Sequence, residues 1–347
     1  MPHTSRSRHP GGWTPSFGWR TTVPLVILLA VAVYVLLPRL AKVEETLGTL
    51  RRLQWWAVAL AVAAQAASNW GGGFMVSRVA RLTGDRLSVA RSVGVGLAAS
   101  SVGLVAGGPI GYATATLYWL RREGISDEGA TLVGWLPAMF NATAMVVFAL
   151  IGFLLLLLGH DVRMPRPLLL IVVATVMALL VTLAVRVLTS DDRIVAVVGG
   201  VRRMWSRLRR RPVDKRALAA VRKRVTFARR ALRRGGWRGV AFGATLNVGF
   251  DLLSLYFLFL AARYPIAVGT MLAGYGLPEV AGRLTFLPGG VGVVEGGMVG
   301  LYRALGVRSS VAVVVVLAYR TLSFWLPTLT GFPLAVLEQR RANADTA

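Results

Sequence analysis

Long apolar runs dominate this chain and restrict its fold more than any other feature. The 347 residues are 55% hydrophobic, and their mean hydropathy is +0.60. In lipid, backbone groups have to be hydrogen-bonded within their own segment, so runs of this kind cross a bilayer as helices. The sequence therefore predicts an all-α polytopic integral membrane protein. The expected spans are 23–37, 54–79, 128–158, 167–188, 237–262 and 310–336.

The charged residues are mostly basic and lie mainly between the apolar runs. There are 40 Lys and Arg against 15 Asp and Glu, a net charge of +25. Basic loops between spans are typical of the cytoplasmic side facing anionic lipid, and this reading excludes nucleic acid as the partner. Residues 1–20 are expected to form a disordered cytoplasmic tail. Residues 190–236 form either two amphipathic helices on an anionic leaflet or a solvated hairpin that only sets topology.

Two apolar stretches, 88–120 and 266–305, are interrupted by glycine and proline. If 88–120 crossed the membrane once, the basic linker would lie outside, whereas a re-entrant helical hairpin places the linker and both termini in the cytoplasm. The same treatment of 266–305 keeps the C-terminal arginines inside. We therefore expect a multi-pass protein of the cell membrane with re-entrant hairpins at 88–120 and 266–305. The expected segments are a first membrane half at 21–189, the linker 190–236, a second half at 237–338 and a tail at 339–347.

An internal repeat supports this plan. Span starts at 54 and 237, breaks at 108 and 289, and span starts at 128 and 310 are separated by 183, 181 and 182 residues. Gln65 and Asn69 match Asn247 and Asp251 at an offset of 182, and each pair shares one helical face. Because the charge argument gives the two copies opposite orientations, the sequence predicts two inverted span–hairpin–span repeats. Many transporters have this plan, with a site near the midplane.

Five ionisable residues in apolar segments are candidates for the site, because charge at membrane depth is costly and usually functional. Glu279 and Arg283 are four residues apart and are placed to pair with each other. The sequence leaves two readings open. The charges are either structural ion pairs, or they line a polar cavity with arginines for an anionic headgroup and carboxylates for a cationic group or a proton. The five residues are Asp251, Glu279, Arg283, Glu295 and Arg320.

Glycines around the two breaks complete the candidate substrate site. Glycine permits tight turns and exposes backbone amides at a helix start, where a phosphate can bind. The alternative reading is close helix packing through small residues. The chain has no cysteine and three scattered histidines, so we expect neither a metal nor another cofactor. The candidates are Gly107, Gly108 and Gly111 in the first hairpin, and Pro288, Gly289, Gly290 and Gly292 in the second.

Three segments carry a family resemblance. LPGGVGVVEGGMVGLYRALGV (287–307), AYRTLSFWLPTLTG (318–331) and, more loosely, GGPIGYATATLYWLRREGIS (107–126) resemble the family named for the transmembrane part of lysylphosphatidylglycerol synthase. The resemblance extends over roughly 20–340. In the full synthase, such a membrane domain moves aminoacylated phosphatidylglycerol between leaflets, and a soluble domain attaches the amino acid. We expect a stand-alone member without that soluble aminoacyltransferase domain. By resemblance, the site positions are Pro288, Gly289, Gly290, Gly292, Glu295 and Arg320.

These observations favour a flippase-like lipid translocase, not an enzyme. Arg283 and Arg320 would attract a phosphate, while Glu279, Glu295 and Asp251 balance charge or take up a proton. One alternative is a non-transporting scaffold or accessory protein of envelope lipid metabolism. A less favoured one is a membrane enzyme acting on lipid phosphate, for which the sequence offers no His or Cys at suitable depth. The expected partners are anionic phospholipids, a lipid or lipid-linked cargo, and either a second copy of the chain or an envelope enzyme.

Overall fold

The computed structural model describes residues 48–105, 108–158, 236–285 and 287–344. These residues form helices and connecting turns, with no strand among them, as expected for an α-helical membrane protein. Several predictions lie outside the described residues. They are the tail 1–20, the spans 23–37 and 167–188, and all but the last residue of the linker 190–236.

Three helices in the described part of the chain are long and apolar enough to cross a membrane. They are α6 (Asp127–Leu158), α10 (Trp237–Ala261) and the continuous helix Ser309–Arg340. At about 1.5 Å per residue, 25 residues extend about 37 Å, which exceeds a hydrocarbon core of about 30 Å. The predicted span 54–79 is helical as α3 (Trp55–Arg81), but α3 falls outside this set. Its amide, glycine and arginine residues lower its hydropathy.

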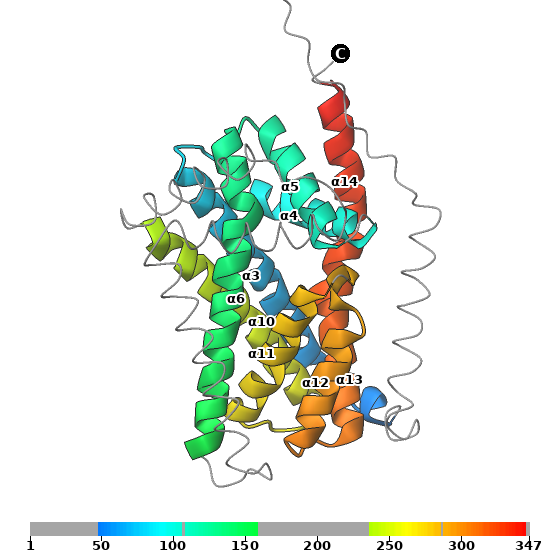
Figure 1. Ribbon diagram of the computed structural model, residues 1–347. Helices are drawn as coiled ribbons and strands as arrows, with labels where there is room; N and C mark the ends of the chain where they lie inside the picture. Colours follow the sequence, from blue (N-terminus) through cyan, green and yellow to red (C-terminus); the bar gives the residue numbers. More distant parts are fainter. Residues whose placement is uncertain (1–47, 106–107, 159–235, 286, 345–347) are drawn as a thin grey trace, which may run out of the picture.

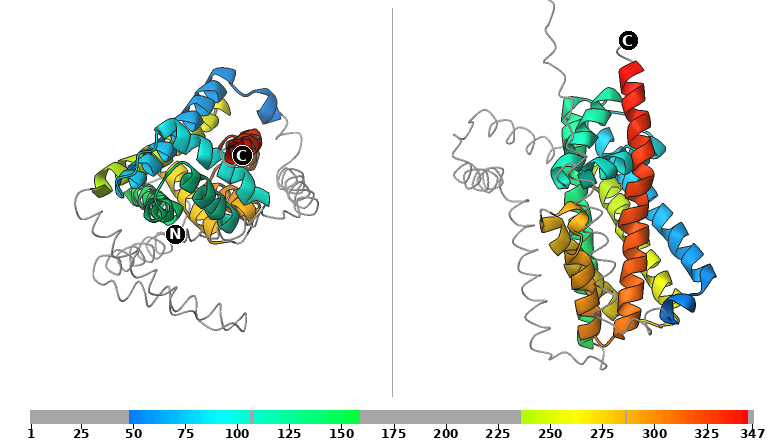
Figure 2. Two further views of the ribbon diagram at one scale, coloured as in Figure 1. Left: turned by 90° about the horizontal axis from the view of Figure 1, so that it is seen from above. Right: turned by 90° about the vertical axis from the view of Figure 1, so that its right-hand side faces the viewer.

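The continuous helix joins α13 (Ser309–Arg320), the π-helical turn η3 (Thr321–Trp325) and α14 (Leu326–Ala344), as Figure 2 shows. A π-helical turn holds one more residue than an α-helical turn and is found frequently at functional sites. The helix continues to Ala344, past the start of the predicted tail at 339, because hydropathy marks where a span leaves lipid and not where its helix ends.

Two pairs of shorter helices occupy the predicted hairpins. The first pair is α4 (Val89–Val105) with α5 (Pro109–Arg122), and the second is α11 (Val268–Leu284) with α12 (Val293–Ala304). With 12 to 17 residues each, they extend about 18–26 Å, less than a hydrocarbon core. The two helices of each pair contact each other, and the pairs lie toward opposite ends of the bundle (Figure 1). Their re-entrant insertion remains a prediction.

Helices α3 and α10 form the closest contact between the two halves. The Ser68 hydroxyl donates to the Asn247 carbonyl at 2.8 Å, and the Asn247 amide donates back to the Ser68 carbonyl at 2.8 Å. Further along, Gly71 lies so close that an added Cβ would be 2.7 Å from the Asn247 nitrogen. Met75 faces Gly243, so residue numbers rise along α3 where they fall along α10. The packing is antiparallel and uses the small residues that close helix approach requires.

The two halves also exchange packing partners. In the second half, α11 packs along α6, where a Cβ at Gly276 would be 3.0 Å from the Met145 carbonyl oxygen. In the first half, α4 packs along α14, where the Ser101 hydroxyl donates to the Thr328 carbonyl at 2.9 Å. Each hairpin therefore rests on the long helix that follows the other hairpin. Two inverted halves that pack their hairpins against each other's long helix would give this arrangement. The inverted repeat itself remains a prediction.

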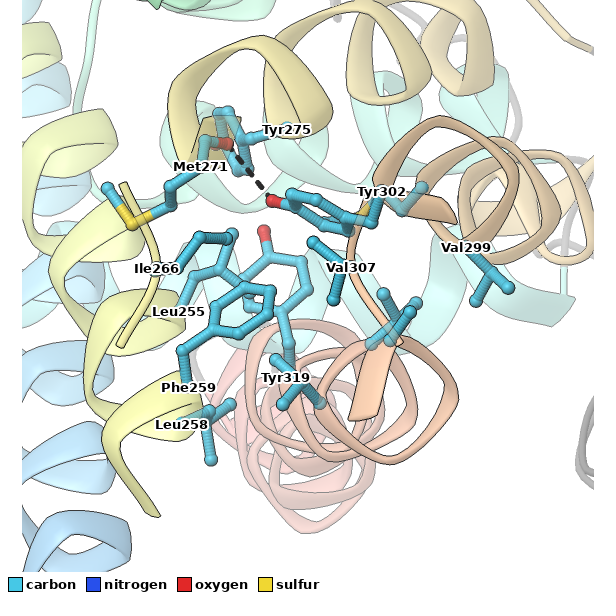
Figure 3. Close-up of a cluster of buried hydrophobic side chains, with 14 of the residues drawn as sticks. Leu255, Leu258, Phe259, Ile266, Met271, Tyr275, Val299, Tyr302, Val307 and Tyr319 are labelled. Atoms are coloured by element: carbon cyan, nitrogen blue, oxygen red, sulfur yellow. Dashed lines mark hydrogen bonds between the residues drawn. The ribbon is translucent and has the colours of Figure 1, made fainter. Parts of the chain in front are cut away.

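A buried apolar cluster fills the space between α10, α11, α12 and α13 (Figure 3). Its largest side chains include Phe259, Tyr275, Tyr302 and Tyr319, each 1% exposed or less. The Tyr302 hydroxyl donates to the Met271 carbonyl at 3.0 Å, so this phenol is satisfied inside the cluster. The hydroxyls of Tyr275 and Tyr319 are directed instead to the charged residues described next.

Candidate functional site

A cavity of about 600 Å³, with charged and amide side chains on its wall, lies among helices of both halves. The breaks of both hairpins reach it, through Gly108 on one side and Gly289 and Gly290 on the other. Four of the five ionisable residues predicted from the sequence line this one space. The charged and amide side chains along its wall are Asp251, Glu279, Arg283, Arg320, Gln65, Asn69, Asn141 and Asn247.

Arg320 ends α13 and is the best-anchored charge of the site. Its side chain is only 5% exposed, and its guanidinium carbon lies 4.7 Å from the centre of the Phe324 ring. Its Nε donates to Glu295 at 2.8 Å, and one terminal nitrogen donates to the Gly289 carbonyl at 2.6 Å. The other terminal nitrogen is 3.8 Å from Glu279. Arg320 thus ties the break of the second hairpin to the long helix.

Glu295 is fully buried and closes the start of α12. One of its oxygens accepts the hydrogen bond from Arg320, and the other accepts from the Gly292 backbone nitrogen at 2.7 Å. A carboxylate in the first turn of a helix is stabilised by the exposed amides and by the helix dipole. The protein's own Glu295 therefore occupies the anion position that the glycines of this break were predicted to offer a phosphate. Glu295 lies behind the cavity wall and not on it.

Two tyrosines hold Asp251. The hydroxyls of Tyr275 and Tyr319 both donate to its Oδ2, at 2.6 and 2.7 Å. The Tyr319 hydroxyl also lies 3.4 Å from an oxygen of Glu279. Asp251 and Glu279 are 9% and 8% exposed, so two nearly buried carboxylates meet at one phenol on the cavity wall.

Arg283 differs from the other charged residues of the cavity. It is exposed, and within the described residues it forms no salt bridge, so the pairing with Glu279 that their spacing allows does not occur. Glu279 lies beside Arg320 instead. A helical spacing of four residues brings two side chains onto one face, but here a partner from another helix is closer. Arg283 keeps its donors available to whatever enters the cavity.

The glycine candidates divide by position. Gly108 begins α5 with φ of 62°, and Gly289 has the same φ within the 3₁₀ turn η2 (Pro288–Gly290). Both φ values favour glycine, because a side chain is strained there. Gly111 is buried in α5 and Gly292 precedes α12, and neither is among the residues that line the cavity. Gly107 lies outside the described residues.

Sequence reasoning missed the polar residues that support the charges. Tyr275 lies four residues before Glu279 on α11, and Tyr319 directly precedes Arg320, so spacing from a known charge was the available signal. The repeat identifies Gln65, Asn69 and Asn247 only as matching positions, yet all three line the cavity. The Oε1 atom of Gln65 is buried without a hydrogen-bond partner. Asn141, on α6, carried no sequence signal.

The fold and the site define a multi-pass α-helical membrane protein with a charged cavity between its halves. The model of the family described as "Lysylphosphatidylglycerol synthase TM region" matches residues 25–331, so the chain belongs to this family. A UPF0104 membrane protein of Pyrococcus horikoshii is 30% identical over 130 residues, 37% of this chain and 38% of the relative. One of Methanocaldococcus jannaschii is 32% identical over 110 residues, 31% and 33% of the two chains. The matched part therefore spans under two-fifths of each relative.

Proposed function

We propose that this protein is a flippase-like lipid translocase that moves a phospholipid or lipid-linked headgroup between the leaflets. The observation that carries the proposal is the charged cavity between the two halves. Its volume of about 600 Å³ lies within the range of about 300–1,000 Å³ that is usual for small-molecule sites. That volume suits a headgroup, while the acyl chains would remain in lipid. Ionisable residues inside a membrane protein usually mark a substrate pathway.

Arg283 is the residue we assign to an anionic headgroup. It lines the cavity, is exposed, and forms no salt bridge within the described chain. The sequence suggested Arg283 and Arg320 as equal partners for a phosphate. Arg320 is already held by Glu295, Gly289 and Glu279, so its role is to position the second hairpin. Specificity for an anionic headgroup then depends on Arg283, whose guanidinium N–H groups have no partner among the described residues.

The exchanged packing of the halves supports a transport cycle. In transporters with inverted repeats, access alternates as one repeat moves against the other around a fixed site. Here each hairpin rests on a long helix of the opposite half, and both hairpin breaks reach the cavity. Movement of the halves would open the cavity toward one membrane face and then toward the other.

The test is leaflet exchange of labelled lipids in vesicles that contain the purified protein. Phosphatidylglycerol, its lysyl ester and phosphatidylethanolamine are compared with wild type, Arg283→Gln and Arg303→Gln. Arg303 is an exposed arginine on α12 outside the cavity and serves as the matched control. Losing one charge-assisted contact of about 1.5–3 kcal/mol should slow exchange about tenfold or more in Arg283→Gln. The control should match wild type.

Two results would contradict the proposal. Equal exchange by Arg283→Gln and wild type would remove Arg283 from the site. Absence of exchange for all three lipids, with a folded protein, would overturn translocation and favour the scaffold alternative. Thermal unfolding in detergent and size-exclusion chromatography establish that each variant is folded.

A further inference from the structure

The buried charges of the site do not balance. Asp251, Glu279 and Glu295 are 9%, 8% and 0% exposed, and the one buried cation beside them in the described chain is Arg320, at 4%. Three negative charges and one positive charge leave −2, and the exposed Arg283 reduces this only to −1. An uncompensated charge away from water is strongly unfavourable. A proton or another cation therefore belongs with these carboxylates.

The geometry identifies which carboxylates share that proton. Glu295 accepts one hydrogen bond from Arg320 and one from the Gly292 backbone, so its two oxygens are satisfied in the ionised form. The other two carboxylates meet at the Tyr319 hydroxyl. That oxygen is 2.7 Å from Asp251 Oδ2 and 3.4 Å from Glu279 Oε1. Two carboxylates joined through one group typically hold a single proton between them.

We propose that Asp251, Tyr319 and Glu279 form a proton-carrying site that couples headgroup movement to proton movement. The inference rests on the proposed translocase function. When Glu279 holds the proton, its O–H donates to the Tyr319 oxygen, and the Tyr319 O–H donates to Asp251. A concerted shift moves the phenol proton to Asp251 and the Glu279 proton to Tyr319. Tyr319 is neutral before and after the shift, and the charge exchanges between the two carboxylates.

The proton enters and leaves through the cavity. Asp251, Glu279 and Tyr319 all line it, so a proton can pass between these side chains and the cavity. No histidine is among the cavity-lining residues of the described chain, so a pH response near the site would come from the carboxylates. The titratable and charged groups that face the site come from five helices. They are Tyr112 from α5, Asp251 from α10, Tyr275, Glu279 and Arg283 from α11, Glu295 from α12, and Tyr319 and Arg320 from α13.

The first experiment measures proton binding without transport. Infrared difference spectra of the wild-type protein in vesicles, titrated with pH, should show a buried carboxylic acid band. Asp251→Asn and Glu279→Gln should each change or abolish the band. Tyr319→Phe keeps both carboxylates and should shift the band, because the bridging hydroxyl is gone. Asp127→Asn, at an exposed carboxylate, should leave it unchanged. Absence of such a band at every pH would overturn the proposal.

The second experiment applies a pH gradient across the same vesicles during lipid exchange. The gradient should drive net accumulation of labelled phosphatidylglycerol in one leaflet, and Tyr319→Phe should reduce this accumulation about tenfold. If lipid exchange occurs but does not depend on the pH gradient, proton coupling is overturned and the proposed translocase function still stands. Accumulation driven by a sodium gradient alone would assign the site to a metal cation and also overturn it. A titrating carboxylic acid without any lipid exchange would contradict the translocase and support only the proton site.

Discussion

The two helical hairpins have their ion pairs at opposite ends. In the second hairpin, the Glu295–Arg320 pair is buried at the tip, where it joins Gly289 to the long helix. In the first hairpin, charge lies at the base: Arg91 at the start of α4 contacts Glu123 at the end of α5. Gly111 of α5 stands three residues after its cap, where α12 has Glu295, and the first turn of α5 has no acid.

The difference shows how two halves of similar architecture can do different work. The tip of the second hairpin is fixed by a buried ion pair and leaves α12 no vacant anion position. The tip of the first hairpin reaches the cavity through Gly108, and the first turn of α5 has no acid to fix it. The second hairpin is therefore held by charge at its tip, and the first is held by charge at its base. Four predictions test this comparison, from the largest effect to the smallest.

Breaking the tip pair of the second hairpin should have the largest effect. Glu295→Gln leaves the Arg320 guanidinium buried with its main partner neutralised, and removing one member of a buried pair typically costs about 3–5 kcal/mol. The free energy of unfolding is measured in detergent by chemical denaturation. Arg303→Gln on the exposed face of α12 is the control, with a cost near zero. Equal stability of the two variants would show that the tip is not held by charge.

The tip of the first hairpin should depend on backbone conformation. Gly108→Ala places a side chain at φ of 62° and ψ of −123°, which should cost about 1–3 kcal/mol. Gly94→Ala is the control: Gly94 lies in α4 with open space around it, so alanine should be neutral or stabilise by up to about 1 kcal/mol. Thermal unfolding of both variants checks the prediction. If Gly108→Ala were as stable as Gly94→Ala, the tip would not be strained.

The base of the first hairpin should contribute less. Arg91 binds Glu338 of α14 in a bidentate arrangement at 2.6 and 2.7 Å, but its side chain is 23% exposed. Arg91→Gln should therefore cost about 1 kcal/mol, as partly solvated pairs do. Added salt should narrow the difference between Arg91→Gln and wild type, and it should not narrow the difference for Glu295→Gln. If added salt left the stability loss of Arg91→Gln unchanged, the ion pair at the base would be shielded from solvent like the pair at the tip, and the prediction would be wrong.

The smallest effect should come from Asp85, which joins the residues before α4 to those after α5. Burial alone would raise the pKa of Asp85, but hydrogen bonds from Thr83 and Ser126 outweigh burial and hold this pKa below its ordinary value of 3.8. A carboxylate whose pKa is lower in the folded state stabilises the fold at pH values above its pKa in the unfolded chain. This stabilisation is lost as the pH falls through the pKa of the folded state. Asp85→Asn should thus unfold more readily than wild type at neutral pH, with the gap closing below pH 3.8. A stability difference between Asp85→Asn and wild type that stays the same at every pH would contradict this prediction.

The sequence predicted the positions of the helix breaks but not the charge partners. Gly108 and Pro288 interrupt apolar runs, and glycine and proline act locally, so the breaks were visible without a structure. The pairing of Arg320 with Glu295 joins α13 to α12, and such a contact depends on how helices pack. Local spacing allows a pair of Glu279 with Arg283 but cannot assign the partners of the buried charges. The same limit hid Asn141, because nothing near it in the sequence is charged.

The π-helical turn η3 determines the direction in which the long helix faces beyond Arg320. One added residue rotates everything after it by about 100° around the helix axis. With that rotation, α13 turns Arg320 toward Glu295 while α14 turns Thr328 toward Ser101 of α4. The extra residue therefore lets one continuous helix contact α12 through α13 and α4 through α14. Without it, an α-helix that contacts α12 would turn Thr328 away from α4. Deleting one residue within η3 would leave the contact of Arg320 with Glu295 in place and rotate Thr328 away from Ser101.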